Sequence, residues 1–107
     1  MANDLTCNPL VIDTAAATAI LSGYLDITNI RWVDYNNDIA DGDQAVVNNA
    51  ASKTIWETRC TATGAGVPLD VKDETAFPFG LQVKGLIVPT LTHGKVYIYF
   101  KGPQPKV

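Results

Sequence analysis

The chain has 107 residues, of which 47% are hydrophobic and 18% are charged, and its formal net charge is −3. This length allows one domain with a single core, and the hydrophobic content excludes a disordered chain. The acidic balance, without any window rich in Lys or Arg, argues against a nucleic-acid partner. Because no apolar run reaches the roughly 18 residues of a membrane span and no export-signal pattern opens the chain, we expect a soluble protein made in the cytoplasm, with no membrane partner.

The first third of the chain predicts two strands separated by an ambiguous segment. Residues 9–13 form a short apolar run behind a proline, which is typical of a strand. Residues 14–23 contain three consecutive alanines that favour a two-turn helix, but also two threonines and a Ser-Gly pair that favour a strand ending in a turn. Residues 26–34 alternate, with Ile30 and Trp32 on one side, and predict a strand.

The middle of the chain predicts a hairpin between two loops. Residues 34–43 form a polar loop with an Asp-Gly turn, and residues 45–49 and 53–60 carry the β-branched and aromatic side chains of a hairpin. This arrangement would place Trp32 and Trp56 on neighbouring strands. Residues 61–80 predict a long loop, with a short strand near residues 68–72 and with Phe77 and Phe79 holding the loop down by apolar contacts.

The last third predicts a closing hairpin. Residues 81–89 and 95–101 are two strand-like runs joined by the sequence TLTHG. In the second run Val96, Ile98 and Phe100 would face the core, and the outward face would consist of Lys95, Tyr97, Tyr99 and Lys101. We therefore expect an all-β fold: a single antiparallel β-sandwich or small barrel of about six to eight short strands over residues 10–101, with an extended N-terminal arm (1–9) and a Pro-rich C-terminal tail (102–107).

The cysteines do not indicate a metal site. Cys7 and Cys60 lie far apart in the sequence, and His93 is the single histidine, whereas a structural zinc site needs about four ligands. Two reduced thiols are the favoured interpretation, and a disulfide formed after release from the cell stays open.

Residues 34–45 match only part of a calcium-binding loop. Asp34, Asn36 and Asp38 have the spacing of the first ligands of a helix-loop-helix site, but Ile39 and Ala45 occupy the positions that require Gly and Glu. We expect a solvated turn and no metal or other cofactor. An irregular calcium site stays open as the alternative, with ligands from Asp34, Asp38, Asp41 and Asp43.

Enzyme motifs are also lacking in the sequence. His93 follows no nucleophile motif and is expected in a hairpin loop. Gly64 and Gly66 precede a proline rather than a helix, so they do not predict a phosphate-binding loop. A carboxylate pair for sugar hydrolysis stays open, either Asp73 with Glu74 or Glu57 with Asp70. We expect a protein that is not an enzyme.

The aromatic side chains allow two interpretations. Trp32, Trp56, Tyr97 and Tyr99 could together form a platform for a sugar ring. Alternatively, the tryptophans belong to the core and the tyrosines lie at a subunit interface, where aromatic residues are enriched. We favour the second interpretation.

The succession IRWVD, AVVNN, TIWE, GLQVKGLIVPTL and GKVYIYFK resembles a group of short β-rich virion proteins of tailed bacteriophages, over about residues 10–101. The resemblance implies a head decoration or cement protein on the outer capsid surface of the virion, made in the host cytoplasm. It would bind the major capsid protein and form a homo-oligomer, either a dimer or a trimer. The long segment 61–80 and the Pro-rich tail depart from the group.

Two other functions stay open: a carbohydrate-binding β-sandwich, and a small tail or neck component of the virion. For the capsid function we expect contacts from the two terminal segments and from exposed aromatic residues. The predicted partner-binding residues are Leu5, Pro9, Phe77, Phe79, Tyr97, Tyr99, Pro103 and Pro105.

Overall fold

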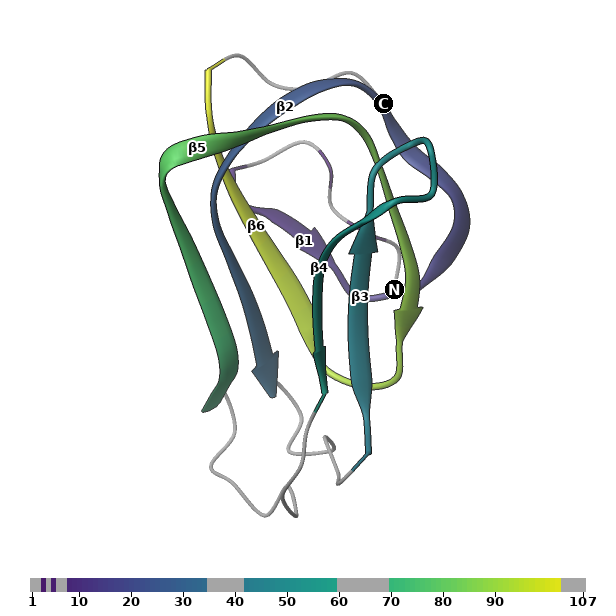
Figure 1. Cartoon of the computed structure of the whole chain (residues 1–107). Helices are drawn as coiled ribbons and strands as arrows, with labels where there is room; N and C mark the ends of the chain where they lie inside the picture. The colour runs from purple at the N-terminus through teal and green to yellow at the C-terminus, as the bar shows by residue number, and fades with distance from the viewer. Residues whose placement is uncertain (1–2, 4, 6–7, 35–41, 60–69, 103–107) are drawn as a thin grey trace.

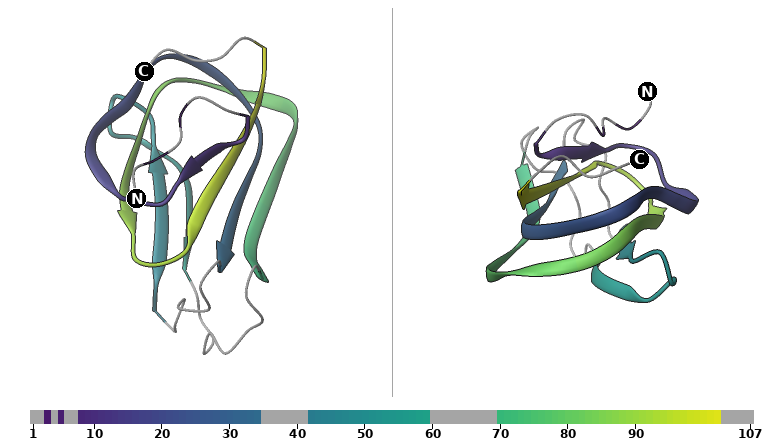
Figure 2. Two further views of the ribbon diagram at one scale, coloured as in Figure 1. Left: turned by 180° about the vertical axis from the view of Figure 1, so that it is seen from behind. Right: turned by 90° about the horizontal axis from the view of Figure 1, so that it is seen from above.

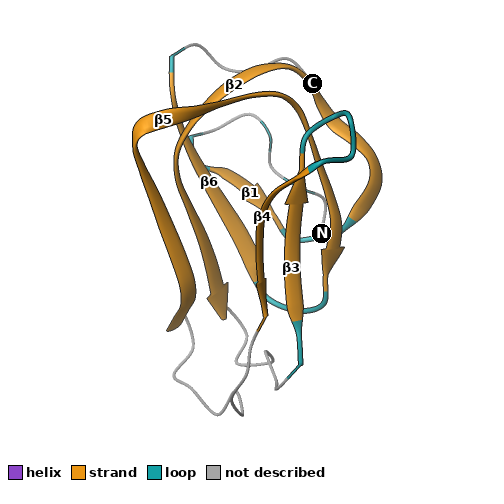
Figure 3. Ribbon diagram, in the orientation of Figure 1, coloured by secondary structure: helices purple, strands orange, loops and turns teal. Residues whose placement is uncertain are grey.

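The computed structural model describes residues 3, 5, 8–34, 42–59 and 70–102. They form six strands and no helix, which confirms the all-β prediction (Figure 3). The strands pair in one antiparallel sheet in the order β1-β6-β2-β5-β3-β4. Their bounds are β1 Leu10–Ile12, β2 Ala16–Asp34, β3 Gln44–Asn48, β4 Thr54–Arg59, β5 Asp70–Leu91 and β6 Lys95–Lys101. None of the described segments is a helix that is long and apolar enough to span a membrane.

Two long strands, β2 and β5, fold this sheet into a sandwich. They pair with each other from Ala16 opposite Val88 to Asp34 opposite Asp70, and both arch over one end of the molecule (Figure 1). The second half of β2 pairs with β6, whereas the end of β5 pairs with β3. The two outer strand pairs, β1 with β6 and β3 with β4, therefore lie in opposite layers (Figure 2).

The arch is produced by irregular pairing between β2 and β5. Between the pairs Leu21–Leu86 and Tyr24–Lys84, β2 contains two residues and β5 contains only Gly85. Gly85 has a φ of +76°, and a Cβ there would collide with Ala50 and lie 3.0 Å from the carbonyl oxygen of Leu21. Since extra residues on one strand bend a sheet, and since only glycine fits this close approach, the local sequence specifies the bend.

The core lies between the layers and contains both tryptophans. Trp32 is fully buried and its Nε1 donates to the carbonyl oxygen of His93 (2.9 Å), while Trp56 Nε1 donates to Thr75 Oγ1 (2.9 Å). The prediction that these tryptophans lie on neighbouring strands is wrong, because β5 and β3 separate β2 from β4. The buried core cluster consists of Leu10, Ile12, Leu21, Leu25, Ile27, Ile30, Trp32, Ala45, Val47, Trp56, Val83, Leu86, Val88, Val96, Ile98 and Phe100.

Several local predictions are confirmed. Strand β1 forms within residues 9–13, β3 and β4 form the predicted hairpin, and the alternation of β6 buries Val96, Ile98 and Phe100. The ambiguous segment 14–23 is a strand from Ala16 onward, not a helix.

The predicted closing hairpin is wrong. Strands β5 and β6 follow each other in the chain, but β2 lies between them in the sheet. Their connection, residues 92–94, passes from the layer of β3 to the layer of β6. A short polar turn can join two strands of one hairpin or two strands in different layers. The turn residues therefore do not determine which strands pair.

The predicted long loop 61–80 is wrong over residues 73–80, whereas the short strand predicted within it at residues 68–72 is confirmed over residues 70–72. Strand β5 begins at Asp70 and continues through Pro78 and Gly80, two residues that usually interrupt strands. Within the described residues, this first part of β5 pairs with β2 alone, so a proline is tolerated there as in an edge strand. Residues 60–69, which include part of the predicted short strand 68–72, lie outside the described residues.

Candidate binding surface on the arch

A four-residue bulge in β5 is the most distinctive feature of the arch. Between the pairs Asn29–Ala76 and Ile27–Leu81, β2 contributes only Thr28, whereas β5 contributes Phe77, Pro78, Phe79 and Gly80. Four residues opposite one cannot all pair with β2, so this part of β5 forms a large β-bulge within the strand. We call residues 77–80 the FPFG bulge.

The two phenylalanines of the FPFG bulge lie in opposite environments. Phe77 is half-buried and packs against the core, whereas Phe79 is 96% exposed. The prediction that both side chains hold this segment down by apolar contacts is therefore confirmed for Phe77 and wrong for Phe79. Pro78 fixes one backbone dihedral between them, and Gly80 has a φ of +78°. A Cβ on Gly80 would collide with the carboxylate of Asp26, so the backbone of the bulge lies directly against β2. Phe77 and Gly80 therefore attach the two ends of the bulge to the domain, and Phe79 is exposed between them.

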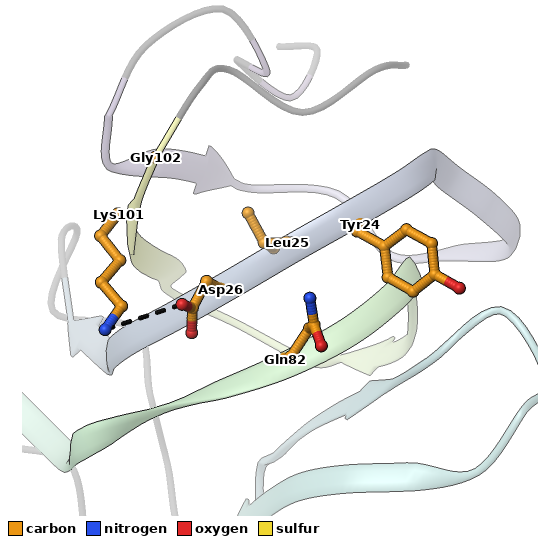
Figure 4. A pocket seen from close by; sticks show the side chains of 6 residues that line it. All are labelled: Tyr24, Leu25, Asp26, Gln82, Lys101 and Gly102. Carbon is orange, nitrogen blue, oxygen red and sulfur yellow. Dashed lines mark ion pairs between the residues drawn. The ribbon is translucent and has the colours of Figure 1, made fainter.

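An open cavity lies beside the bulge. It has a volume of about 470 Å³ and is lined by residues of β2, β5 and the end of β6: Tyr24, Leu25, Asp26, Gln82, Lys101 and Gly102 (Figure 4). Lys101 Nζ lies 3.7 Å from Asp26 Oδ2, so one wall of the cavity is an ion pair. Because Gly80 contacts this same Asp26, the cavity and the bulge belong to one surface.

Tyr24 is the second exposed aromatic residue of this surface. Its side chain is 64% exposed, and Lys84 Nζ lies 5.8 Å from the centroid of its ring. This distance is within the range of a cation–π contact. We define the arch surface as Tyr24, Asp26, Phe79, Gln82, Lys84 and Lys101.

The predicted tyrosine face lies elsewhere, on the outer side of β6. Tyr97 is opposite Arg31 of β2 and Tyr99 is opposite Asn29, and both tyrosines are half-buried. Around them, Glu74 Oε2 accepts hydrogen bonds from Asn29 Nδ2 (2.8 Å) and Arg31 Nε (3.0 Å). The tyrosines therefore border a polar network rather than an apolar patch.

This network changes the ionisation of both charged groups. The hydrogen bond from Asn29, followed by that from Arg31, lowers the pKa of Glu74. The hydrogen bond to Glu74 and its negative charge raise the pKa of Arg31, to which Tyr99 adds a smaller contribution. Glu74 is therefore held as a carboxylate, which does not suit it as the acid of a hydrolytic pair.

Two other carboxylate candidates, Asp73 and Glu57, lie on different strands, and the pairing of Asp73 with Glu74 stays a prediction. Asp73 Oδ1 accepts a hydrogen bond from the backbone N–H of Glu74 (2.8 Å), and Glu57 is exposed on β4. The side chain of Asp70 lies outside the described part, so its predicted pairing with Glu57 stays a prediction.

The terminal segments are described only in part. Leu5 is half-buried against the core, and Pro9 is also half-buried. Asn8 Nδ2 donates to the carbonyl oxygen of Phe100 (2.7 Å), which attaches the end of the arm to β6. The predicted contacts Pro103 and Pro105 lie outside the described residues.

His93 forms a hydrogen bond with a buried acid. Its Nδ1 lies 2.6 Å from Asp43 Oδ2, and Asp43 is 9% exposed. Thr92 N–H donates to the carbonyl oxygen of Gln44 (3.0 Å) beside this pair. These contacts attach the layer-crossing connection to the start of β3, at the end of the sandwich opposite the arch (Figure 1).

The metal and cysteine predictions fall mostly outside the described residues. Asp38, Asp41 and the side chain of Asp34 are not described, and neither are Cys7, Cys60, Gly64 and Gly66. Among the residues that are described, no group of three His, Cys, Asp or Glu side chains could hold a metal ion.

The predicted sugar platform is wrong for both tryptophans. Trp32 is fully buried and Trp56 is 7% exposed, so neither ring face is accessible for stacking. The core interpretation of the tryptophans is confirmed. Sequence analysis missed Tyr24, Gln82 and Lys84, although Tyr24 directly follows the Ser-Gly pair that marks a bulge in β2.

Comparison of the chain with protein-family models, with curated proteins and with solved structures found no match.

Proposed function

We propose that this protein is a non-enzymatic structural component of a tailed-bacteriophage virion, a decoration or cement protein that binds the outer face of the major capsid protein. The observation that carries the proposal is Phe79, which is 96% exposed on a bulge supported by Phe77, Pro78 and Gly80. An apolar side chain stabilises a domain only when it is buried, so an exposed Phe79 adds little to the stability of the isolated domain. Phenylalanine is among the aromatic residues enriched at protein interfaces, so Phe79 is suited to anchor a partner.

The mechanism of such a protein is packing. Fully burying one phenylalanine contributes about 1.5–3 kcal/mol, which is weak for a single contact. Many copies on one lattice, each joined to neighbouring subunits and associated as a dimer or trimer, would convert weak contacts into strong stabilisation of the lattice. The resemblance in the order of strand sequences and the net charge of −3 agree with a place on the outside of the capsid, away from the packaged DNA.

Co-sedimentation with empty capsids tests this proposal. The purified protein is mixed with capsids of its phage, pelleted and quantified against capsid protein. We expect saturable binding with a fixed number of copies per capsid subunit. Protein that stays in the supernatant at every concentration would contradict the proposal.

A second candidate function is carbohydrate binding, which one observation favours. The 64% exposed ring of Tyr24 borders an open cavity with polar side chains from Asp26, Gln82 and Lys101. Stacking on an aromatic ring, combined with a few polar groups, is a common way to bind a sugar. Binding on a glycan array that is lost in Tyr24→Ala, with an unchanged melting temperature, would support this function over capsid binding.

A further inference from the structure

The arch carries a net positive charge although the chain as a whole is acidic. The described segments of the arch, residues 20–28, 49–53, 79–86 and 101–102, contain Lys53, Lys84 and Lys101 but only one acid, Asp26. Their net charge is therefore +2. Since the whole chain has a formal net charge of −3, the rest of it has a net charge of −5.

The three lysines come from three different elements that meet at the arch. Lys84 belongs to β5 and Lys101 to β6, and both are exposed. Lys53 is exposed in the β3–β4 turn, and that turn is joined to β5 by the hydrogen bond from Ala50 N–H to the Lys84 carbonyl oxygen (3.0 Å). A local positive surface on an acidic protein favours an acidic partner.

The residues beside Phe79 distinguish between classes of acidic partner. Asp26 lines the cavity and contacts the bulge, and its carboxylate would repel the closely spaced phosphates of a nucleic acid. Insertion into a membrane surface generally uses a wider apolar face than one phenylalanine and one tyrosine. One apolar anchor with a mixed polar rim is the arrangement expected of a protein interface.

We propose that the arch surface, together with Lys53 of the adjacent β3–β4 turn, docks onto an acidic protein surface. Phe79 is inserted into an apolar recess of the partner, and Lys53, Lys84 and Lys101 face its carboxylates. This inference rests on the proposed function, because it identifies the partner as the outer face of the capsid protein. Around Phe79, polar groups of the partner form hydrogen bonds with Asp26, Lys101 and Gln82.

Capsid binding by charge and anchor variants tests the inference. The set is wild type, Phe79→Ala, Phe79→Leu, the double variant Lys53→Glu/Lys84→Glu, and Arg59→Glu. Arg59 is exposed at the end of β4 remote from the arch, so Arg59→Glu reverses a charge without altering the proposed surface. Melting curves confirm that each variant folds, and affinities for empty capsids are measured at low and high salt.

We expect Phe79→Ala to weaken binding at least about tenfold, since truncation of an interface anchor usually has this effect. Phe79→Leu should recover part of the affinity. The double lysine variant should bind about tenfold more weakly at low salt and lose most of the salt dependence of the wild type, whereas Arg59→Glu should stay within about twofold of it.

The outcomes separate the two proposals. If wild type binds capsids and the Phe79 and lysine variants bind equally well, the inference is overturned while the proposed function stands. If wild type does not bind capsids at all, the proposed function fails and the inference fails with it. If binding occurs instead to vesicles containing anionic lipid and is lost in the same variants, a membrane replaces the protein as the partner and the inference is overturned.

Discussion

Phe77 and Phe79 are separated by one proline, yet Phe77 packs against the core and Phe79 is 96% exposed. The FPFG bulge separates their roles, because Phe77 fastens the segment to the domain and leaves Phe79 available for a partner. This relationship connects the fold to the proposed function and gives the first prediction.

Truncating the two phenylalanines should have different effects on stability. Phe77→Ala should lower the free energy of unfolding by about 1–3 kcal/mol, less than a fully buried phenylalanine would, because Phe77 is half-buried. Phe79→Ala should change it by less than about 0.5 kcal/mol. Urea denaturation measures both values, and an equal loss in the two variants would contradict separate roles.

Gly85 should be required for the bend of β5. Gly85→Ala combines a positive φ with collisions against Ala50 and the Leu21 backbone, whereas Gly42→Ala has a similar φ of +90° with no atom within 4 Å. We expect Gly42→Ala to cost about 1 kcal/mol and Gly85→Ala to cost at least about 1 kcal/mol more. The difference in melting temperature between the two variants measures the cost of the collisions at Gly85 alone. Equal melting temperatures would show that the bend tolerates a side chain.

The hydrogen bond between Trp56 and Thr75 should stabilise the contact between the layers. Trp56→Phe and Thr75→Val should each lower the free energy of unfolding by about 1–2 kcal/mol, because each leaves one part-buried partner unsatisfied. In a double-mutant cycle, the two losses should add to more than the loss in the combined variant. Strict additivity would show that the two side chains do not interact.

Glu74 should make stability depend on pH on the acidic side. Its pKa is lowered from the ordinary value of 4.5, so it stabilises the folded state above the unfolded pKa, and this contribution is lost as pH falls through the folded pKa. Glu74→Gln should therefore lower the melting temperature at neutral pH, and this effect should shrink as the pH falls below the ordinary pKa of 4.5 and Glu74 becomes protonated. Melting curves across this range test it, with Glu57→Gln as the control on an exposed strand. A difference that grows on acidification would contradict the assigned direction.

Sequence reasoning succeeded where the determining interactions are local. The alternation of β6 buries Val96, Ile98 and Phe100 as predicted, and the β3–β4 hairpin forms around a short polar turn. Both patterns depend on side chains close together in the sequence. The pairing of β6 with β2 instead of β5 depends on contacts between distant segments, which a period of two cannot specify.

The candidate surface was only partly predictable for the same reason. Phe79 was predicted as a contact residue, but its neighbours on the arch surface come from three strands. Pro78 and Gly80 looked like loop residues because each usually interrupts a strand, whereas here they shape a bulge within one. Tyr24 directly follows residues 14–23, which the sequence does not assign to either a helix or a strand. The sequence therefore does not indicate which side of the fold Tyr24 faces.

The copy number of this protein in purified virions is the most direct test of the central claim. Quantitative mass spectrometry relative to the major capsid protein measures it without knowledge of the binding site. A decoration protein predicts hundreds of copies per particle, in a fixed ratio to capsid subunits. Absence from intact virions would contradict the claim, and only six or twelve copies would assign the protein to the neck or tail instead.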